Sequence, residues 1–330
     1  MYATSILDLA RVPRGTSVSD GLASCVATAQ LAEQCGYERV WYAEHHNLAT
    51  VASSAPAVLI AHVAAHTSTI RLGAGGVMLP NHAPLVIAEQ FGTLATLHPG
   101  RIELGVGRAP GSDQVTMRAM RRDHRAADTF DDDVRELRDL LAGVERGDGV
   151  TAIPGAGTNV PIFVLGSSLY GARLAARLGV PYAFASHFAP SALVEAIALY
   201  RSEFQPSADH EQPWAMAAVN VICDHDADSA LRQFHAAARE RVALIVPKGV
   251  SYTDEQADQV LASPQGRNLL QMMHYSAVGT PSEVGAYLAE FARHAGADEL
   301  VLAHSSPRVE DRLTSIELTA SSVGSVAVSH

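Results

Sequence analysis

The sequence has 330 residues, of which 48% are hydrophobic and 18% are charged, and its formal net charge at neutral pH is −11. This composition is sufficient for a large core and is atypical of a disordered chain. The acidic balance also argues against a nucleic-acid partner, because such a partner requires a basic face.

The first half of the chain alternates strand-like runs with helical runs. Strands are predicted at 4–9, 39–43, 70–79 and 102–106. Helices are predicted at 18–35, 55–66, 84–97 and about 127–143. Ser19 and Asp20 are candidate caps of the first helix, and Gly36 is its predicted end.

The second half repeats this rhythm until residue 225. Strands are predicted at 162–165, 182–185, 214–223 and 299–303, and helices at 170–178, 191–204, 282–295 and near 309–318. Residues 226–278 depart from the pattern and indicate an insertion after the seventh strand. A loop of this length in a compact fold favours a functional role such as a lid, although an ordered decoration of the rim is the alternative. The tail, 320–330, is expected to fray.

Eight strands that alternate with helices favour a (β/α)₈ TIM barrel, within the α/β class. An open doubly wound sheet is the alternative fold. No linker rich in proline, glycine or serine divides the chain, so residues 1–330 are interpreted as one domain that includes the insertion.

Three scattered cysteines, Cys25, Cys35 and Cys223, form neither a disulfide framework nor a CxxC pair. We expect buried thiols and a reducing, cytoplasmic location. The N-terminal residues lack the pattern of a signal peptide, and no uninterrupted apolar run of about 18 residues predicts a membrane span.

In a TIM barrel the working face is built from the loops that follow the strands. Polar or glycine residues stand at most of these positions: Asp8, Glu44-His45-His46, Gly75-Gly76, Arg108, Ser167-Ser168 and Ser186-His187. Neighbouring residues of an extended chain point to opposite faces, so His45 and His46 are poorly placed to bind one ion together. A composite metal site of Glu44, His45 and His187 is an open alternative that lacks any HExxH spacing.

The segment LGSSLYGA, residues 165–172, predicts an anion site. A strand ends there, small residues follow, and a helix begins whose free N–H groups attract a phosphate. Ser167 and Ser168 add hydroxyl donors, and Arg108 at the neighbouring strand end adds a cation. The alternative is a capped helix start with no ligand. GVGRAPG, residues 105–111, has the spacing GxGxxxG and does not fit a dinucleotide-binding loop.

Several stretches carry a family resemblance: residues 37–47 (YERVWYAEHHN), 70–111, 164–188, 279–284 and 296–302. Together they resemble the bacterial luciferase-like monooxygenase superfamily, in its flavin-type branch. The resemblance implies a barrel that receives reduced FMN from a separate NAD(P)H-dependent flavin reductase. It also implies that the flavin forms a hydroperoxide with dioxygen and oxygenates a small apolar substrate, such as an aldehyde. A homodimer packed through the helices after the second and third strands is implied as well.

The resemblance also suggests roles for single residues. Glu44 and His45 are similar to the family's acidic and histidine pair beside the flavin, with His45 as catalytic base and His46 turned away. Gly75-Gly76 resembles a site of a non-prolyl cis peptide beneath the flavin ring.

Arg108 and Ser168 look like phosphate anchors, and Asp8 like a further cofactor contact. Bacterial luciferase has a second arginine beyond GVGRAPG. Here Asp128 falls near that position, and the candidates to replace the arginine are Arg118, Arg122 and Arg125.

Two other functions remain open at this point. A deazaflavin-dependent oxidoreductase would use the same barrel to transfer hydride, and a non-catalytic relative would bind flavin without turnover. No metal is expected. The sequence does not identify the substrate.

Overall fold

The computed structural model describes residues 2–109, 111–145, 147, 149–247 and 250–323. Nine parallel strands form one sheet, and eight of them close into a barrel because β6 pairs with β7 and β1 pairs with β9. The eight are β1 (Ala3–Asp8), β2 (Arg39–Tyr42), β3 (Arg71–Met78), β4 (Ile102–Gly107), β5 (Ile162–Gly166), β6 (Tyr182–Phe184), β7 (Ala215–Cys223) and β9 (Glu299–His304). The predicted TIM barrel is confirmed, and the open sheet is wrong.

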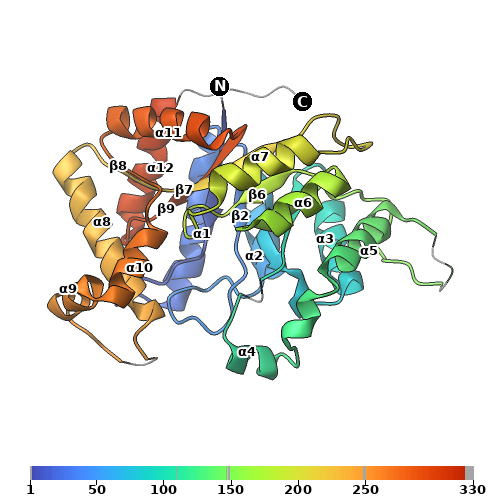
Figure 1. The fold of residues 1–330 in the computed structure, drawn as a ribbon, viewed down its shortest axis with the longest axis horizontal. Coiled ribbons are helices and arrows are strands. Elements are labelled where there is room, and N and C mark those ends of the chain that lie inside the picture. The colour runs from blue at the N-terminus through green and yellow to red at the C-terminus, as the bar shows by residue number, and fades with distance from the viewer. Residues whose placement is uncertain (1, 110, 146, 148, 248–249, 324–330) are drawn as a thin grey trace.

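Helices surround this sheet (Figure 1). They are α1 (Val18–Gln34), α2 (Pro56–Ala64), α3 (Pro84–Leu97), α5 (Phe130–Ala142), α6 (Leu169–Leu178), α7 (Leu193–Glu203), α11 (Pro281–Ala295) and α12 (Val309–Val323). Three short elements lie between β3 and α5: η1 (Leu79–Asn81), α4 (Gln114–Ala119) and η2 (His124–Ala127).

Some predicted helix ends differ from the observed ones. The N-cap of α1 is Ser17, whose hydroxyl accepts from the Asp20 N–H while the Asp20 carboxylate accepts from the Ser17 N–H, so Asp20 belongs to a capping box. Residues 320–323 of the predicted frayed tail form the end of α12, and 324–330 lie outside the described residues.

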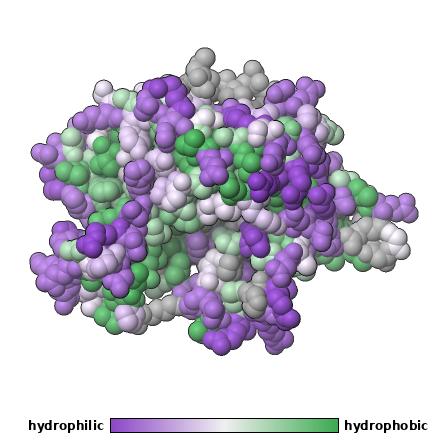
Figure 2. Space-filling model, viewed as in Figure 1, coloured by the Kyte–Doolittle hydropathy of each residue, from purple (hydrophilic) through white to green (hydrophobic). Residues whose placement is uncertain are grey.

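The insertion contains α8 (Ala227–Arg241), η3 (Val242–Leu244), α9 (Asp254–Ala262), α10 (Pro264–Met272) and β8 (Ser276–Gly279). The strand β8 was not predicted, and it pairs only with the C-terminal half of β7. In Figure 1, α9 and α10 lie toward the same lower end of the molecule as α4. The space-filling view shows a notch at this end, between the part that contains α9 and α10 and the part that contains α4 (Figure 2).

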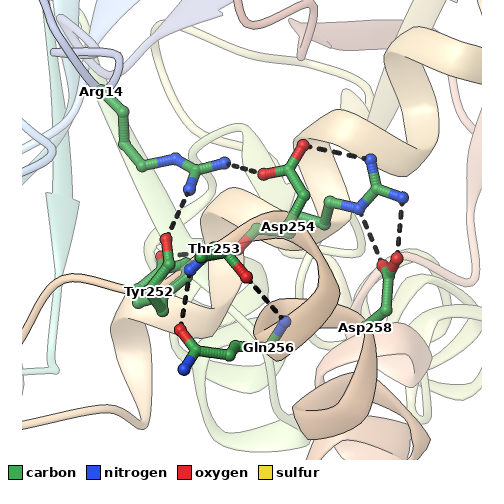
Figure 3. Close-up of polar contacts among 7 residues, drawn as sticks. Arg14, Tyr252, Thr253, Asp254, Gln256 and Asp258 are labelled. Atoms are coloured by element: carbon green, nitrogen blue, oxygen red, sulfur yellow. Dashed lines mark hydrogen bonds and ion pairs between the residues drawn. The ribbon is translucent and has the colours of Figure 1, made fainter.

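A polar clamp attaches the insertion to the loop after β1 (Figure 3). The Arg14 guanidinium pairs with Asp254 at 2.8 Å, donates to the Tyr252 carbonyl at 3.3 Å and lies 5.2 Å from the centre of the Tyr252 ring. Arg239 of α8 reaches Asp258 at 2.7 Å and Asp254 at 3.4 Å. The start of α9 is therefore fixed between α8 and the β1 loop.

The barrel interior has a charged floor beneath an apolar layer. Arg39 is buried between Glu103, at 2.9 Å, and Glu299, at 3.0 Å. Trp41 and Trp214 each donate an indole N–H to one of these carboxylates at 3.0 Å. The apolar layer above consists of Leu7, Trp41, Ala43, Phe163, Ala183, Met216, Ala218 and Val301. This filled interior confines any ligand site to the carboxyl ends of the strands.

Two further observations bear on the chain as a whole. Cys25 and Cys223 are buried and Cys35 is half-buried, and all three are free thiols. No helix in the described part of the chain combines the length and apolar character needed to cross a bilayer.

Candidate active site at the carboxyl ends of the strands

Glu44 is fully buried just after β2, and two imidazoles share one of its oxygens. His46 Nε2 and His82 Nε2 each lie 2.8 Å from Glu44 Oε1, and Oε2 accepts the Met78 N–H at 3.1 Å. Burial acts to raise the pKa of Glu44, but the hydrogen bond and charge of His82, together with His46 and the Met78 N–H, lower it overall. Glu44 is thus an anion that fixes the β2 loop to the end of β3.

His45 is not the hydrogen-bond partner of Glu44. Its backbone N–H donates to the Ser53 carbonyl at 3.0 Å, while His46 forms the contact with Glu44 and His82 supplies a partner that the sequence analysis missed. Burial lowers the pKa of His45, and a backbone hydrogen bond at Gly111 and the charge of Glu44 offset this only in part. The imidazole of His45 is therefore neutral at neutral pH and able to accept a proton.

The Gly75–Gly76 peptide is cis, as expected. Both glycines are required by packing within the barrel wall. A Cβ on Gly75 would lie 2.8 Å from Trp41 Cβ, and one on Gly76 would lie 2.8 Å from the Gly105 carbonyl oxygen of β4. A larger residue at position 76 would displace β4, so such a variant would report on the fold rather than on a ligand. The predicted contact with a flavin ring stays a prediction.

Arg108 follows β4 and lies against the first turn of α6. Its guanidinium carbon is 4.2 Å from the centre of the Tyr170 ring, and its Nε donates to the Ala127 carbonyl at 3.2 Å. The Tyr170 hydroxyl donates to Asp131, and Asp131 also pairs with Arg177 at 2.6 Å. Burial, then the hydrogen bond to Asp131, raises the pKa of Tyr170 to about 12, so the ring beneath Arg108 remains neutral.

The N-terminus of α6 is open. Ser168 is the N-cap in an extended conformation, yet its side chain forms no cap hydrogen bond, and both Ser167 and Ser168 are exposed. The first N–H groups of a helix need partners from elsewhere when no side chain caps them. The structure thus brings Arg108, Ser167 and Ser168 together around uncapped backbone donors, an arrangement that fits a phosphate. The side-chain cap that the alternative requires is not observed, and a phosphate at this site stays a prediction.

The three candidates for a second arginine differ in position. Arg122 is half-buried, and its Nε donates to the Asn81 carbonyl at 3.2 Å, directly after β3. Arg125 pairs with Asp123 at 2.8 Å on the surface, and Arg118 is exposed on α4. Of the three, Arg122 is the one that contacts η1, the short helix that follows β3.

Asp8 lies across the barrel from the start of α6. In the sheet order, β1 is separated from β5 by β2, β3 and β4. One Asp8 oxygen accepts the Ala10 N–H at 2.8 Å, and the other is buried without a hydrogen-bond partner. Asp8 therefore cannot share a phosphate with Arg108, and its contact with another part of a cofactor stays a prediction.

On the β6–β7 side, a second group of polar residues surrounds the mouth, and the sequence analysis singled out only His187. The Asn220 amide donates to the His187 carbonyl at 2.7 Å and accepts from Arg241 at 3.0 Å. Burial, then the charges of Arg241, Arg11 and His45, lowers the pKa of His187 to about 3, so its imidazole is neutral. Within the described ranges, no three His, Cys, Asp or Glu side chains are grouped so that they could hold a metal ion.

Comparison with known proteins decides the family. The model of the luciferase-like monooxygenase family matches residues 3–299. The chain belongs to this family. A luciferase-like monooxygenase of Escherichia coli K12 is 45% identical to this chain over 324 residues, which cover 96% of this chain and 95% of the relative. The *Bacillus subtilis* N-acetyl-S-alkylcysteine monooxygenase is 36% identical over 256 residues, covering 76% and 75%.

Solved structures agree with this assignment. Apo-MsnO8 superposes on this family member with a TM-score of 0.86 at 32% identity, and 98% of each chain is covered. Two further structures are 18% identical to this chain, so their likeness concerns the fold alone. Each superposition covers at least 98% of this chain and of the other protein. The oxygenating constituent of 3,6-diketocamphane monooxygenase from *Pseudomonas putida*, in complex with FMN, has a TM-score of 0.71. An F420-dependent secondary alcohol dehydrogenase has a TM-score of 0.70.

Proposed function

We propose that this family member is the oxygenating component of a two-component flavin monooxygenase. Reduced FMN from a separate NAD(P)H-dependent reductase would bind at the barrel mouth, with its phosphate at Arg108 and the start of α6. The observation that carries the proposal is the uncapped α6 N-terminus beside an arginine that has no ion pair among the described residues. The FMN-bound monooxygenase of the same fold supports the choice of cofactor.

Bound reduced FMN would supply the oxygen chemistry, in which one atom of dioxygen would go to the substrate and the other would leave as water. The residues of this chain position and protect that chemistry. Arg108 and the α6 N–H groups would hold the phosphate, and the neutral imidazole of His45 would accept a proton. Glu44 keeps the loop that carries His45 attached to the end of β3.

A deazaflavin-dependent oxidoreductase is the second candidate, favoured by the F420-dependent dehydrogenase that shares the fold. A deazaflavin also carries a phosphorylated tail, so the α6 site suits both cofactors. The cofactor that copurifies with the protein distinguishes them by its absorption spectrum and mass: two flavin bands support FMN, and a single band near the violet supports a deazaflavin.

Rapid mixing of the reduced FMN complex with dioxygen tests the reaction itself. A transient hydroperoxide absorbance before the oxidised flavin appears would support the monooxygenase. Direct reoxidation without this intermediate would instead favour a protein that carries flavin without using it.

We also propose that the protein forms a homodimer through α2 and α3. Large apolar side chains are exposed on these helices: Val58 at 71%, Val86 at 44% and Leu97 at 64%. Val58→Glu should shift the mass measured by light scattering from dimer to monomer, whereas Val194→Glu on α7 should leave it unchanged. An unchanged mass for Val58→Glu would contradict this interface.

A further inference from the structure

A group of arginines lies on the side of the barrel mouth opposite the α6 phosphate site. Arg11 is in the loop after β1, and Arg241 is the last residue of α8. Arg312 of α12 is close enough to Arg11 to lower its pKa, after the larger effect of burial, while Glu240 and Asp8 act in the opposite direction. In a chain of net charge −11, this is a local concentration of positive charge away from bulk water.

Arg241 and Arg312 form no ion pair with a carboxylate among the described residues, whereas the charges of Glu240 and Asp8 act on Arg11. Arg241 donates from Nη2 to the Asn220 amide oxygen at 3.0 Å, but its Nε is buried without a partner. Arg312 donates to the Ser24 hydroxyl at 2.8 Å and leaves Nε and Nη1 unpartnered. A buried cation is costly unless an anion or a full set of acceptors compensates it, so a group of this kind indicates a missing anion.

Asn220 places Arg241 inside the mouth. Side chains along a strand alternate between faces, and Met216 and Ala218 of β7 belong to the apolar layer of the barrel interior. Asn220 continues that row toward the carboxyl end. Its amide oxygen also accepts from the Ser305 hydroxyl at 3.3 Å, at the end of β9. The guanidinium bound to Asn220 therefore stands at the top of the interior column.

We infer that Arg241 and Arg11 form an anion subsite of the substrate pocket, and that the substrate is a small organic molecule with a carboxylate or a comparable monoanionic group. The inference rests on the proposed function, because it places the rest of the substrate toward the flavin. It replaces the purely apolar substrate that the family resemblance implies. The flavin phosphate has its own site at β4 and β5, across the barrel from β1.

The electrostatics of the ligand-free protein agree with this assignment. Burial, then repulsion from Arg11, lowers the pKa of Arg241 to about 9, so the side chain is still a cation at neutral pH but is destabilised by its surroundings. A bound carboxylate would compensate both effects. His187, held neutral beside it, adds no competing positive charge.

The test compares two probes of nearly equal shape, hexanoate and hexanamide, by isothermal titration of the FMN-loaded protein. We expect hexanoate to bind at least tenfold more tightly, which corresponds to about 1.4 kcal/mol. Arg241→Gln should abolish that preference. Arg232→Gln, at an exposed position of the same helix that pairs with Asp226 at 3.6 Å, should retain it. Equal binding of acid and amide, or an unchanged preference in Arg241→Gln, would overturn the inference.

Three further measurements separate the alternatives. Repeating the titrations without flavin tests the subsite even if FMN does not bind and the proposed function fails. FMN and riboflavin affinities of Arg241→Gln should match those of the wild type, because a selective loss of FMN would assign this arginine to the flavin phosphate and overturn the substrate subsite. The melting temperature of ligand-free Arg241→Gln should not fall, since the substitution removes an uncompensated charge. A fall would show that Arg241 stabilises the fold instead, and would count against the subsite.

Discussion

The charged floor of the barrel gives a quantitative prediction of stability. Arg39 is 3% exposed and lies between Glu103, 3% exposed, and Glu299, fully buried, at distances of 2.9 and 3.0 Å. Arg39→Met would remove the cation and leave two carboxylates buried without it. Breaking a buried ion pair from one side typically costs about 3–5 kcal/mol. That is a large part of the roughly 5–15 kcal/mol that stabilises a folded domain.

The chain contains its own probes for this experiment. Its two tryptophans, Trp41 and Trp214, donate to Glu103 and Glu299, so urea unfolding followed by tryptophan fluorescence reports on the floor directly. Arg71→Met is the matched control, because Arg71 is 25% exposed and lies 3.6 Å from Glu103. We expect its loss to stay below about 1 kcal/mol.

The pH dependence sharpens the prediction. In Arg39→Met the uncompensated carboxylates gain protons more readily when folded than when unfolded, so the deficit should shrink as the pH falls. A loss no greater than that of Arg71→Met, or one independent of pH, would refute the view that Arg39 compensates two buried anions.

Three other predictions concern the mouth and the insertion. His187 and His304 have pKa values near 3 in the folded state, because burial and then nearby arginines lower them from the ordinary 6.5. Their contribution to the stability of the fold is therefore complete above about pH 6.5 and is lost as the pH falls toward 3. The two groups give a slope approaching about 2.7 kcal/mol per pH unit near pH 5; His304→Gln should about halve it in urea titrations, and an unchanged slope would exclude His304 as a source. His45→Ala should leave FMN affinity within about tenfold, or about 1.4 kcal/mol, but raise the hydrogen peroxide released per dioxygen consumed, and unaltered coupling would remove His45 from proton transfer. Arg14→Ala should speed proteolysis between α8 and α9 while Arg232→Ala does not, because Arg14 pairs with Asp254 and Arg232 pairs with Asp226 instead; equal cleavage would show that the clamp is unimportant.

Local patterns were sufficient for the barrel but not for its long-range partners. Alternating apolar runs and helix signals predicted every strand of the barrel, because each strand is buried in the core and is therefore apolar. The strand β8 escaped notice because SAVG is only four residues long and forms by pairing with the C-terminal half of β7, which β6 leaves unpaired. Its existence depends on β6 ending early, which no local signal indicates.

The candidate site shows the same division. Arg108 and the serines before α6 could be found because strand ends converge in a barrel. The pairing of Glu44 with His82 joins residues 38 positions apart, and Arg241 comes from the end of a helix in the insertion. Sequence periodicity gives the face on which a side chain lies, but not which distant side chain meets it there.

The affinity of the protein for FMN relative to riboflavin tests the central claim most directly. The account predicts that the wild type prefers FMN, and that Arg108→Ala weakens FMN by about tenfold or more, since hydrogen bonds to charged groups contribute about 1.5–3 kcal/mol, while riboflavin binding hardly changes. Arg118→Ala, at an exposed position on α4, should behave as the wild type. Equal losses of FMN and riboflavin in Arg108→Ala, or no preference in the wild type, would contradict a phosphate held between Arg108 and the start of α6.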